Sequence, residues 1–335
     1  MAFLFEYGLF LAKAVTIVIA IGAIIVLIVG ASQKPKSKSG EIEVKDLSSQ
    51  LAETKEEFLQ RTLDKKALKA HLKENKKKTD EKPEKQAFVI DFSGSIDAHE
   101  VASLREEITA ILTIANKDKD QVLVNVESGG GVVHGYGLAA SQLIRLKQAG
   151  LPLTISVDKV AASGGYMMAC VADKIVAAPF AIVGSIGVLA QIPNFNKILK
   201  KNDVDFEQIT AGEYKRTLTM FGENTDQGRD KFKSEVEHTH TLFKQFVSEH
   251  RPSLDIDKVA TGEHWFATHA KEFDLVDEIK TSDDLLLELN ETHQLFSVKY
   301  KTKKALAERF GLGLSIVAEK LGIKLLSQLQ TNTYK

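Results

Sequence analysis

The sequence predicts an α/β protein with a mainly parallel sheet, preceded by one membrane-spanning helix. From residue 87 onward, short β-branched runs alternate with apolar residues at helical spacing, a pattern typical of βαβ units. Ahead of them, residues 14–32 carry no formal charge and would span roughly 28 Å as a helix, which matches a bilayer core. A chain of 335 residues can hold one large domain together with such an appendage.

The apolar stretch is expected to act as a membrane anchor within residues 1–33. A cleaved signal peptide is the alternative, because Lys13 precedes the stretch and residues 29–31, Val-Gly-Ala, resemble a small-residue cleavage site. The apolar core of a signal peptide usually has about 7–15 residues, which is shorter than this stretch. The length therefore favours an anchor.

The next segment, residues 34–86, is expected to form a charged juxtamembrane helix followed by a linker. Apolar residues recur at a loosely helical spacing over residues 41–75, among many Lys and Glu. Residues 74–86 contain no apolar side chain, so they cannot pack in a core and are typical of a solvated tether.

The main domain is expected over residues 87–300. Runs rich in Val, Ile and Leu predict buried strands, whereas apolar residues three and four positions apart predict helices. The expected strands lie at residues 87–92, 121–127, 153–157 and 174–178, and the helices between them at residues 101–115, 136–149 and 164–172. In parallel sheets, functional residues usually lie in loops after the carboxyl ends of the strands.

Composition narrows the possible partners and cofactors. The formal net charge is −1 and no basic face is evident, so a nucleic-acid partner is not expected. Cys170 is the single cysteine, which excludes an intramolecular disulfide and leaves no Cys/His cluster typical of zinc sites. No metal or organic cofactor is expected.

A glycine-rich loop, Ser128–Gly131, follows the expected strand 121–127. Consecutive glycines allow backbone N–H groups to face outward, where they can hold an oxyanion or a peptide backbone. A sharp turn or a phosphate cradle is the alternative, although neither a GxGxxG nor a GxxxxGK[ST] spacing is present. The loop alone does not decide between these roles.

A second loop, residues 160–166, follows the expected strand 153–157. Small residues on both sides of Ser163 permit a tight turn that presents the hydroxyl, and the Gly164 N–H can contribute to an oxyanion hole. A G-x-S-x-G motif is absent. The alternative is that Ser163 only caps the following helix, a common role for serine at that position.

Four motifs in order resemble the S49 peptidase family, the signal-peptide peptidase A group. They are VNVESGGGVVHGYG (124–137), VDKVAASGGYMMACVADKIVAAP (157–179), VGSIGV (183–188) and AGEYKRTLT (211–219). The similarity covers about residues 87–285. It implies a ClpP/crotonase-like spiral of βαβ units and a membrane-anchored serine endopeptidase that cleaves peptides or signal-peptide remnants.

The resemblance also assigns roles to individual residues. It implies Ser163 as nucleophile, Lys215 as general base, Gly130 and Gly164 as oxyanion-hole donors, and Ser185 as the residue that orients the lysine. Gly129 departs from the family pattern, which usually has Pro there. Loss of that Pro raises the unfolded-state entropy, at a cost of about 1 kcal/mol, without removing any N–H donor.

Histidine is the usual base for a serine nucleophile, but no ordering of Asp and His around Ser163 compels a triad among the nine histidines. A lysine can replace histidine only when it is neutral, which requires a pKa lowered from about 10.4 toward 7–8. Arg216 adjoins Lys215 and must therefore point away from such a site. From the residues alone, a solvent-exposed lysine is the ordinary expectation for Lys215.

The C-terminal segment, residues 301–335, is expected to form an amphipathic tail, suited to a subunit contact, to the bilayer surface or to packing on its own domain. The resemblance implies a homo-oligomer, with the dyad completed by a neighbouring subunit in some arrangements. It also implies a catalytic domain on the periplasmic side of a bacterial inner membrane. The lysines that follow the apolar stretch favour the opposite orientation.

Two other functions remain open at this stage. A non-catalytic membrane scaffold or peptide-binding protein would use the same fold and bind peptides without turnover. A crotonase-like acyl-CoA enzyme would also use backbone oxyanion donors, but it would not need Lys215.

Overall fold

The computed structural model describes residues 7–11, 13, 15–18, 40–78 and 83–302. The chain divides into two units, residues 42–300 and the two chain ends. The predicted anchor and the predicted C-terminal tail lie largely outside the described residues. Among the helices that are described, none is long and apolar enough to cross a membrane.

A seven-stranded sheet forms the centre of the unit over residues 42–300, in the order β1-β10-β2-β3-β4-β6-β9 within the described chain. From β10 to β9 all neighbouring strands pair in parallel. The strands are β1 (Glu41–Asp46), β2 (Gln86–Ser93), β3 (Gln121–Glu127), β4 (Leu153–Val157), β6 (Lys174–Ala177), β9 (Glu278–Ile279) and β10 (Gln294–Lys301). The predicted α/β class with a mostly parallel sheet is confirmed.

Both faces of this sheet are covered, so the central strands are apolar on both sides. In β2, residues 87–90 are all buried. Ile90 packs in the larger core beside the helices α4 (Val101–Ile114) and α5 (Val133–Gln148). Val89 lies in a smaller cluster beside α11 (Ser282–Asn290) on the other face. Burial of each such side chain contributes about 1.5–3 kcal/mol to folding.

The described chain also contains a second sheet, of three short strands. Its strands are β5 (Val160–Ala162), β7 (Ile182–Gly184) and β8 (His264–Phe266). β5 pairs with β7 in parallel, and β7 pairs with β8 antiparallel. We call it the small sheet. Ser163 and Ser185 directly follow β5 and β7.

Residues 41–78 differ from the single juxtamembrane helix that the sequence predicts. Residues 41–46 form β1, and two helices follow, α2 (Leu47–Thr62) and α3 (Lys65–Lys78). Two caps explain the breaks: Asp46 accepts the Ser49 N–H at 2.8 Å, and Asp64 accepts the Ala67 N–H at 2.8 Å. His71 of α3 contacts Glu56 of α2 at 2.9 Å, so the two helices form a hairpin.

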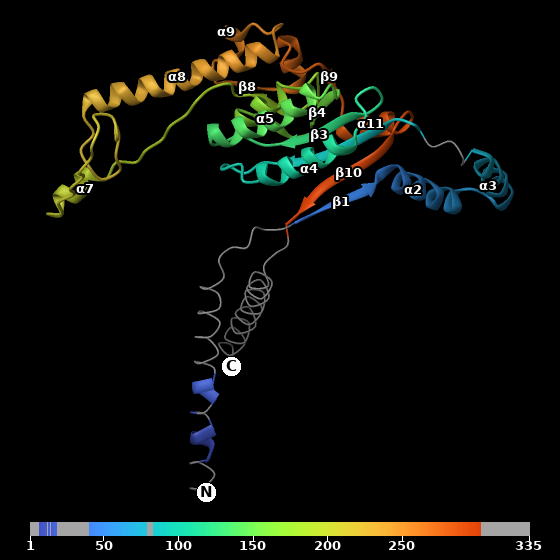
Figure 1. The fold of residues 1–335 in the computed structure, drawn as a ribbon, viewed down its shortest axis with the longest axis horizontal. Helices are drawn as coiled ribbons and strands as arrows, with labels where there is room; N and C mark the ends of the chain where they lie inside the picture. Colours follow the sequence, from blue (N-terminus) through green and yellow to red (C-terminus); the bar gives the residue numbers. More distant parts are fainter. Residues whose placement is uncertain (1–6, 12, 14, 19–39, 79–82, 303–335) are drawn as a thin grey trace, which may run out of the picture. The chain divides into compact units, whose positions relative to one another are not determined.

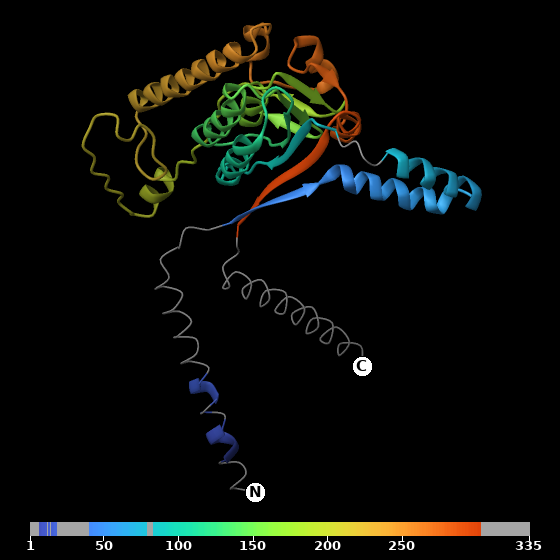
Figure 2. The same cartoon turned by 45° about the vertical axis from the view of Figure 1, so that its right-hand side comes forward.

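Residues 189–225, which we call the arm, precede the long helix α8 (Asp226–His250) and contain the short helix α7 (Asn196–Lys201). Both views show α7 and the loops after it near the start of α8, away from the sheet (Figures 1 and 2). The arm has its own packing, since the Phe221 ring lies 6.0 Å from Phe195 and 5.7 Å from Phe206.

Only the second half of α8 is fixed to the core, through Phe243 and Val247. Its C-terminal end is held by Arg251, which donates to both carboxylate oxygens of Asp277 at 2.7 and 2.9 Å. Between Arg251 and Asp277 the chain forms α9 (Ile256–Val259), β8, α10 (Ala267–Ala270) and a 3-10 turn over Lys271–Phe273. The first half of α8 therefore extends the arm beyond the sheet.

Candidate active site

Ser163 lies on a strained turn between β5 and the short helix α6 (Gly164–Ala169). Its backbone has φ 52° and ψ −116°. This conformation costs a non-glycine residue about 1–3 kcal/mol, and residues that adopt such conformations cluster at functional sites. The Ser163 N–H donates to the Gly184 carbonyl at 2.8 Å, which fixes the turn to β7. The small sheet thus supports the strain.

The Ser163 hydroxyl does not cap α6, in contrast to the structural alternative raised by the sequence. Within the described residues it makes no hydrogen bond, and the side chain is half-buried. A serine that is held in a strained turn and whose hydroxyl makes no structural hydrogen bond is available for chemistry.

The glycine loop packs directly on this turn. Ser128 exchanges two backbone hydrogen bonds with β5, because its N–H donates to Val160 at 2.9 Å and its carbonyl accepts from Ala162 at 3.0 Å. Gly130 has φ 87°, and a Cβ added there would lie 2.6 Å from the Gly164 nitrogen and 2.8 Å from the Ser163 Cβ. Only glycine allows this approach. The structure therefore brings Gly130, Ser163 and Gly164 together.

The amides of this loop point in different directions. The Gly130 N–H donates to the Ser128 hydroxyl oxygen at 3.1 Å, toward the protein interior. Gly131 instead lines a pocket with Ser163 and Gly164, and its N–H has no partner among the described residues. The Gly164 N–H is the first of α6 and has no intrahelical partner either.

The pocket beside Ser163 is small and mainly apolar. It lies between the start of α5, α6, the loop after β7 and the middle of α8. The residues that line it are Gly131, Val133, Ser163, Gly164, Met167, Gly187, Val188, Thr239 and Phe243. The sequence did not indicate Thr239 or Phe243 as site residues, because a single threonine or phenylalanine in a long helix carries no signal for a pocket.

Ser185 occupies the position equivalent to Ser163 on the neighbouring strand. β5 and β7 pair in parallel with Ala162 opposite Gly184, so the two serines follow at the same edge, about 5 Å apart along the sheet. Ser185 also has a positive φ, 51°, and its N–H donates to the Glu263 carbonyl at 2.6 Å. The structure therefore brings Ser185 to the Ser163 site.

Lys215 lies elsewhere in the same chain. It is exposed, and its neighbours contact the first turns of α8: Glu213 accepts from Gln227 at 3.3 Å, and a Cβ on Gly228 would lie 2.4 Å from the Thr217 carbonyl. From Gly228 to Thr239, which lines the Ser163 pocket, α8 rises roughly 17 Å. A four-carbon lysine stem does not span that length. Within one chain the structure does not join Lys215 to Ser163.

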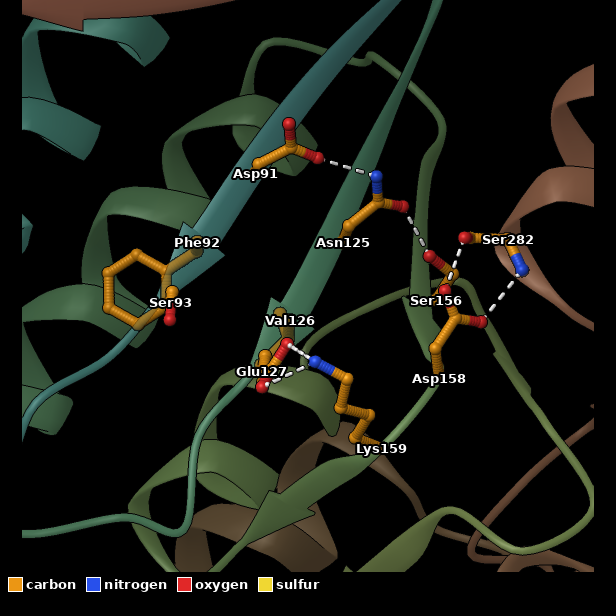
Figure 3. Close-up of a pocket in the computed structure, with 10 residues that line it drawn as sticks. All are labelled: Asp91, Phe92, Ser93, Asn125, Val126, Glu127, Ser156, Asp158, Lys159 and Ser282. Atoms are coloured by element: carbon orange, nitrogen blue, oxygen red, sulfur yellow. Dashed lines mark hydrogen bonds and ion pairs between the residues drawn. The ribbon is translucent and has the colours of Figure 1, made fainter.

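A separate polar pocket lies on the other side of the sheet, at the ends of β2, β3 and β4 (Figure 3). Its side chains are paired with one another: Asn125 donates to Asp91 at 2.7 Å and accepts from Ser156, while Lys159 donates to Glu127 at 3.0 Å. In the described part of the chain, no three His, Cys, Asp or Glu side chains group as metal ligands. These contacts tie neighbouring strands together.

Comparison with known proteins places these features in a family. Peptidase family S49 N-terminal matches residues 2–143, and Peptidase family S49 matches residues 145–296. The chain is 54% identical to "Probable protease SohB" of Haemophilus influenzae over 323 residues, 91% of each chain. It is 52% identical to "Probable protease SohB" of Buchnera aphidicola from Acyrthosiphon pisum, covering 92% of this chain and 94% of the relative.

A more distant relative is similar over part of its length. "Protease 4" of Haemophilus influenzae is 30% identical over 221 residues, which is 64% of this chain and 35% of that protein. The resemblance expected from the four motifs is therefore confirmed, and both S49 models together account for most of the sequence. The chain belongs to peptidase family S49.

Proposed function

We propose that the chain is a membrane-anchored serine endopeptidase in which Ser163 is the nucleophile and Lys215 the general base. The observation that carries this proposal is the Ser163 turn: a strained backbone, a hydroxyl with no structural partner, and two unpartnered amides at one pocket. Membership of a peptidase family and relatives named as proteases support peptide hydrolysis as the reaction. We further assign the two sheets to a ClpP/crotonase-like spiral.

The oxyanion hole is formed by the N–H groups of Gly164 and Gly131. Gly130 was the donor expected from the sequence, but its N–H is bound by the Ser128 hydroxyl, which leaves Gly131 as the loop amide that faces the pocket. Two backbone donors near the nucleophile can stabilise the developing oxyanion at no cost in side-chain ordering. Ser185 orients the lysine from the neighbouring strand.

Lys215 is supplied by a second copy of the chain. Within one copy, α8 rises roughly 17 Å between the turn that contacts the arm near Lys215 and the turn that lines the Ser163 pocket. The arm also exposes large apolar side chains, with exposed fractions of 79% at Leu189, 59% at Ile198 and 95% at Ile209. Such side chains are typical of a surface that is covered by a partner. Docking of the arm on a neighbour would bury them and place Lys215 at that neighbour's serine.

The reaction follows as acyl transfer. The Lys215 amine takes the Ser163 proton while the serine oxygen bonds to the peptide carbonyl carbon, and the amides hold the negative oxygen. The protonated lysine then gives its proton to the leaving amine as the C–N bond breaks. Lys215 next takes a proton from water as the water oxygen bonds to the ester carbon, and it returns that proton to the Ser163 oxygen when the ester C–O bond breaks and the acid leaves.

The pocket indicates the substrate class. Val133, Met167 and Phe243 give it an apolar wall, and it is too small for a large aromatic side chain. We therefore expect cleavage of peptides, signal-peptide remnants among them, beside small apolar residues. Each methylene group of the substrate that is buried against this wall favours binding, while the size of the pocket excludes larger side chains.

Labelling with a fluorophosphonate tests the nucleophile. The full chain in detergent should be modified on Ser163, as shown by mass spectrometry of the labelled peptide, and Ser163→Ala should not be labelled. A non-catalytic scaffold or peptide-binding protein on this fold would bind peptides but would leave Ser163 unmodified. An acyl-CoA enzyme would retain activity without Lys215, whereas the proposed peptidase would not.

Residues 14–32 anchor the chain in the bacterial inner membrane as a single span, with the catalytic domain on the periplasmic side. A reporter fused after Gln86, at the start of β2, tests this orientation. Alkaline phosphatase, which folds only outside the cytoplasm, should be active at that point, and a cytoplasm-dependent fluorescent reporter should be dark. The reverse pattern, favoured by the lysines after the span, would place the domain in the cytoplasm.

A further inference from the structure

We propose that Ser128 and Tyr136 are positioning residues that hold both proposed oxyanion donors in place through one buried hydrogen-bond chain. This inference rests on the proposed peptidase function and adds two residues to it. Neither side chain touches the reacting atoms. They act through the backbone of Gly130, Gly131 and Gly164.

The hydrogen bonds of this chain can run in only one direction. The Tyr136 hydroxyl donates its proton to the Ser95 carbonyl at 2.7 Å, because a carbonyl cannot donate. The Ser128 hydroxyl lies 2.5 Å from the Tyr136 oxygen and 3.4 Å from the Gly94 carbonyl, so its proton goes to the much closer tyrosine oxygen. The Ser128 oxygen is left to accept the Gly130 N–H at 3.1 Å. The tyrosine thus fixes the serine, and the serine fixes the Gly129–Gly130 peptide plane, which is one residue before the peptide that carries the Gly131 N–H.

The tyrosine ring supports the second donor. A Cβ added to Gly164 would lie 2.3 Å from the Tyr136 Cγ, so the ring packs directly against the Gly164 backbone. At the hydroxyl end, a Cβ on Gly94 would lie 2.6 Å from the Tyr136 oxygen and 2.9 Å from the Ser128 oxygen. The Tyr136 ring therefore contacts the backbone of Gly164, and the Tyr136 hydroxyl acts on the Gly131 side of the site through Ser128.

Both side chains are buried, with exposed fractions of 0% for Tyr136 and 2% for Ser128. Burial raises the pKa of the Tyr136 phenol, the Ser128 hydrogen bond lowers it by less than burial raises it, and the nearby acids Glu100 and Asp97 raise it further. The phenol therefore keeps its proton at neutral pH, and the chain of hydrogen bonds stays complete there. Water cannot replace a lost member in so closed a site without rearrangement.

Two substitutions and one matched control test the role. Tyr136→Phe and Ser128→Ala should each lower kcat for peptide hydrolysis by about 10- to 100-fold, with KM changed less than about twofold, since the oxyanion forms only after binding. Tyr166→Phe is the control: Tyr166 is also fully buried, and its hydroxyl donates at 3.1 Å to the Leu275 carbonyl, which belongs to neither loop. It should lose similar thermal stability but keep kcat.

A peptide aldehyde separates positioning from stability. Its adduct with Ser163 carries an oxygen in the oxyanion hole, so its inhibition constant should weaken by the same factor as kcat in both variants. The matching peptide alcohol, which forms no adduct, should bind as to wild type. If Tyr136→Phe does not fold, Ser128→Ala, which removes a single hydroxyl, decides the test.

Two results overturn different claims. Retention of wild-type kcat and aldehyde affinity in Ser128→Ala, in a protein whose turnover depends on Ser163, would remove the positioning role alone. Absence of any Ser163-dependent turnover in the wild-type chain would remove the proposed peptidase function and this inference with it.

Discussion

Replacement of Ser163 by alanine should lower peptide hydrolysis by about 10⁴-fold or more, because no other group can form the acyl intermediate. The fold should be preserved, since the hydroxyl makes no hydrogen bond to any described residue and the backbone contact to Gly184 remains. Digestion of a peptide library by the wild type and the variant side by side, with products identified by mass spectrometry, gives both the loss and the cleavage preference.

Ser141→Ala is the matched control for this substitution. Ser141 is an exposed serine of α5 whose hydroxyl donates to the Gly137 carbonyl at 2.8 Å. Its removal should leave hydrolysis unchanged. Cleavage of the library by Ser163→Ala at the wild-type positions and rates would show that another residue is the nucleophile.

Replacement of Lys215 by arginine should reduce hydrolysis by about 10³-fold or more, although the positive charge is kept. A guanidinium does not lose its proton in proteins, so it cannot accept the proton of Ser163. Lys215 is exposed in the single chain, so the exchange should leave the fold of each chain unchanged. Steady-state kinetics on a peptide substrate should show the loss in kcat.

Lys200→Arg provides the control within the same arm. Lys200 is exposed and donates to Glu223 at 2.9 Å, an ion pair that arginine can also make. This variant should keep full activity. Full activity in Lys215→Arg as well would exclude Lys215 as the base, and with it the Ser–Lys dyad.

Much of the fold could be predicted because the central strands are buried on both faces. Runs such as residues 121–127 and 153–157 are rich in Val, Leu and Ile, and the structure has β3 and β4 over those same residues. The small sheet escaped prediction because its three strands have only three residues each, which is too short for any periodicity. Yet that sheet supports the strain of the Ser163 turn.

The helical hairpin and the supporting tyrosine show two other limits. Residues 41–46 pair with a distant strand, β10, and such pairing overrides the loose helical spacing seen in the sequence. Tyr136 reads as one more residue on the apolar face of α5, and only the fold reveals that its hydroxyl reaches Ser128. Long-range contacts of both kinds leave no local pattern.

The local pattern indicated a turn at Ser163 with a donor at Gly164, and the family resemblance assigned their roles, whereas Lys215 was assigned by the resemblance alone. Sequence spacing does not record which side chains meet in space. Sequence spacing also does not show which side chains meet between two copies. The position of the arm beside the start of α8 could be known only from the structure.

Mixing two inactive variants tests the central claim most directly. In oligomers assembled at random from equal amounts of Ser163→Ala and Lys215→Arg chains, a neighbour can supply the missing partner. If the dyad forms between copies, random assembly pairs an intact Ser163 with an intact Lys215 at about a quarter of the sites, and about a quarter of wild-type activity should return. Mixed oligomers that remain as inactive as each variant alone, while the wild type hydrolyses peptides, would contradict it.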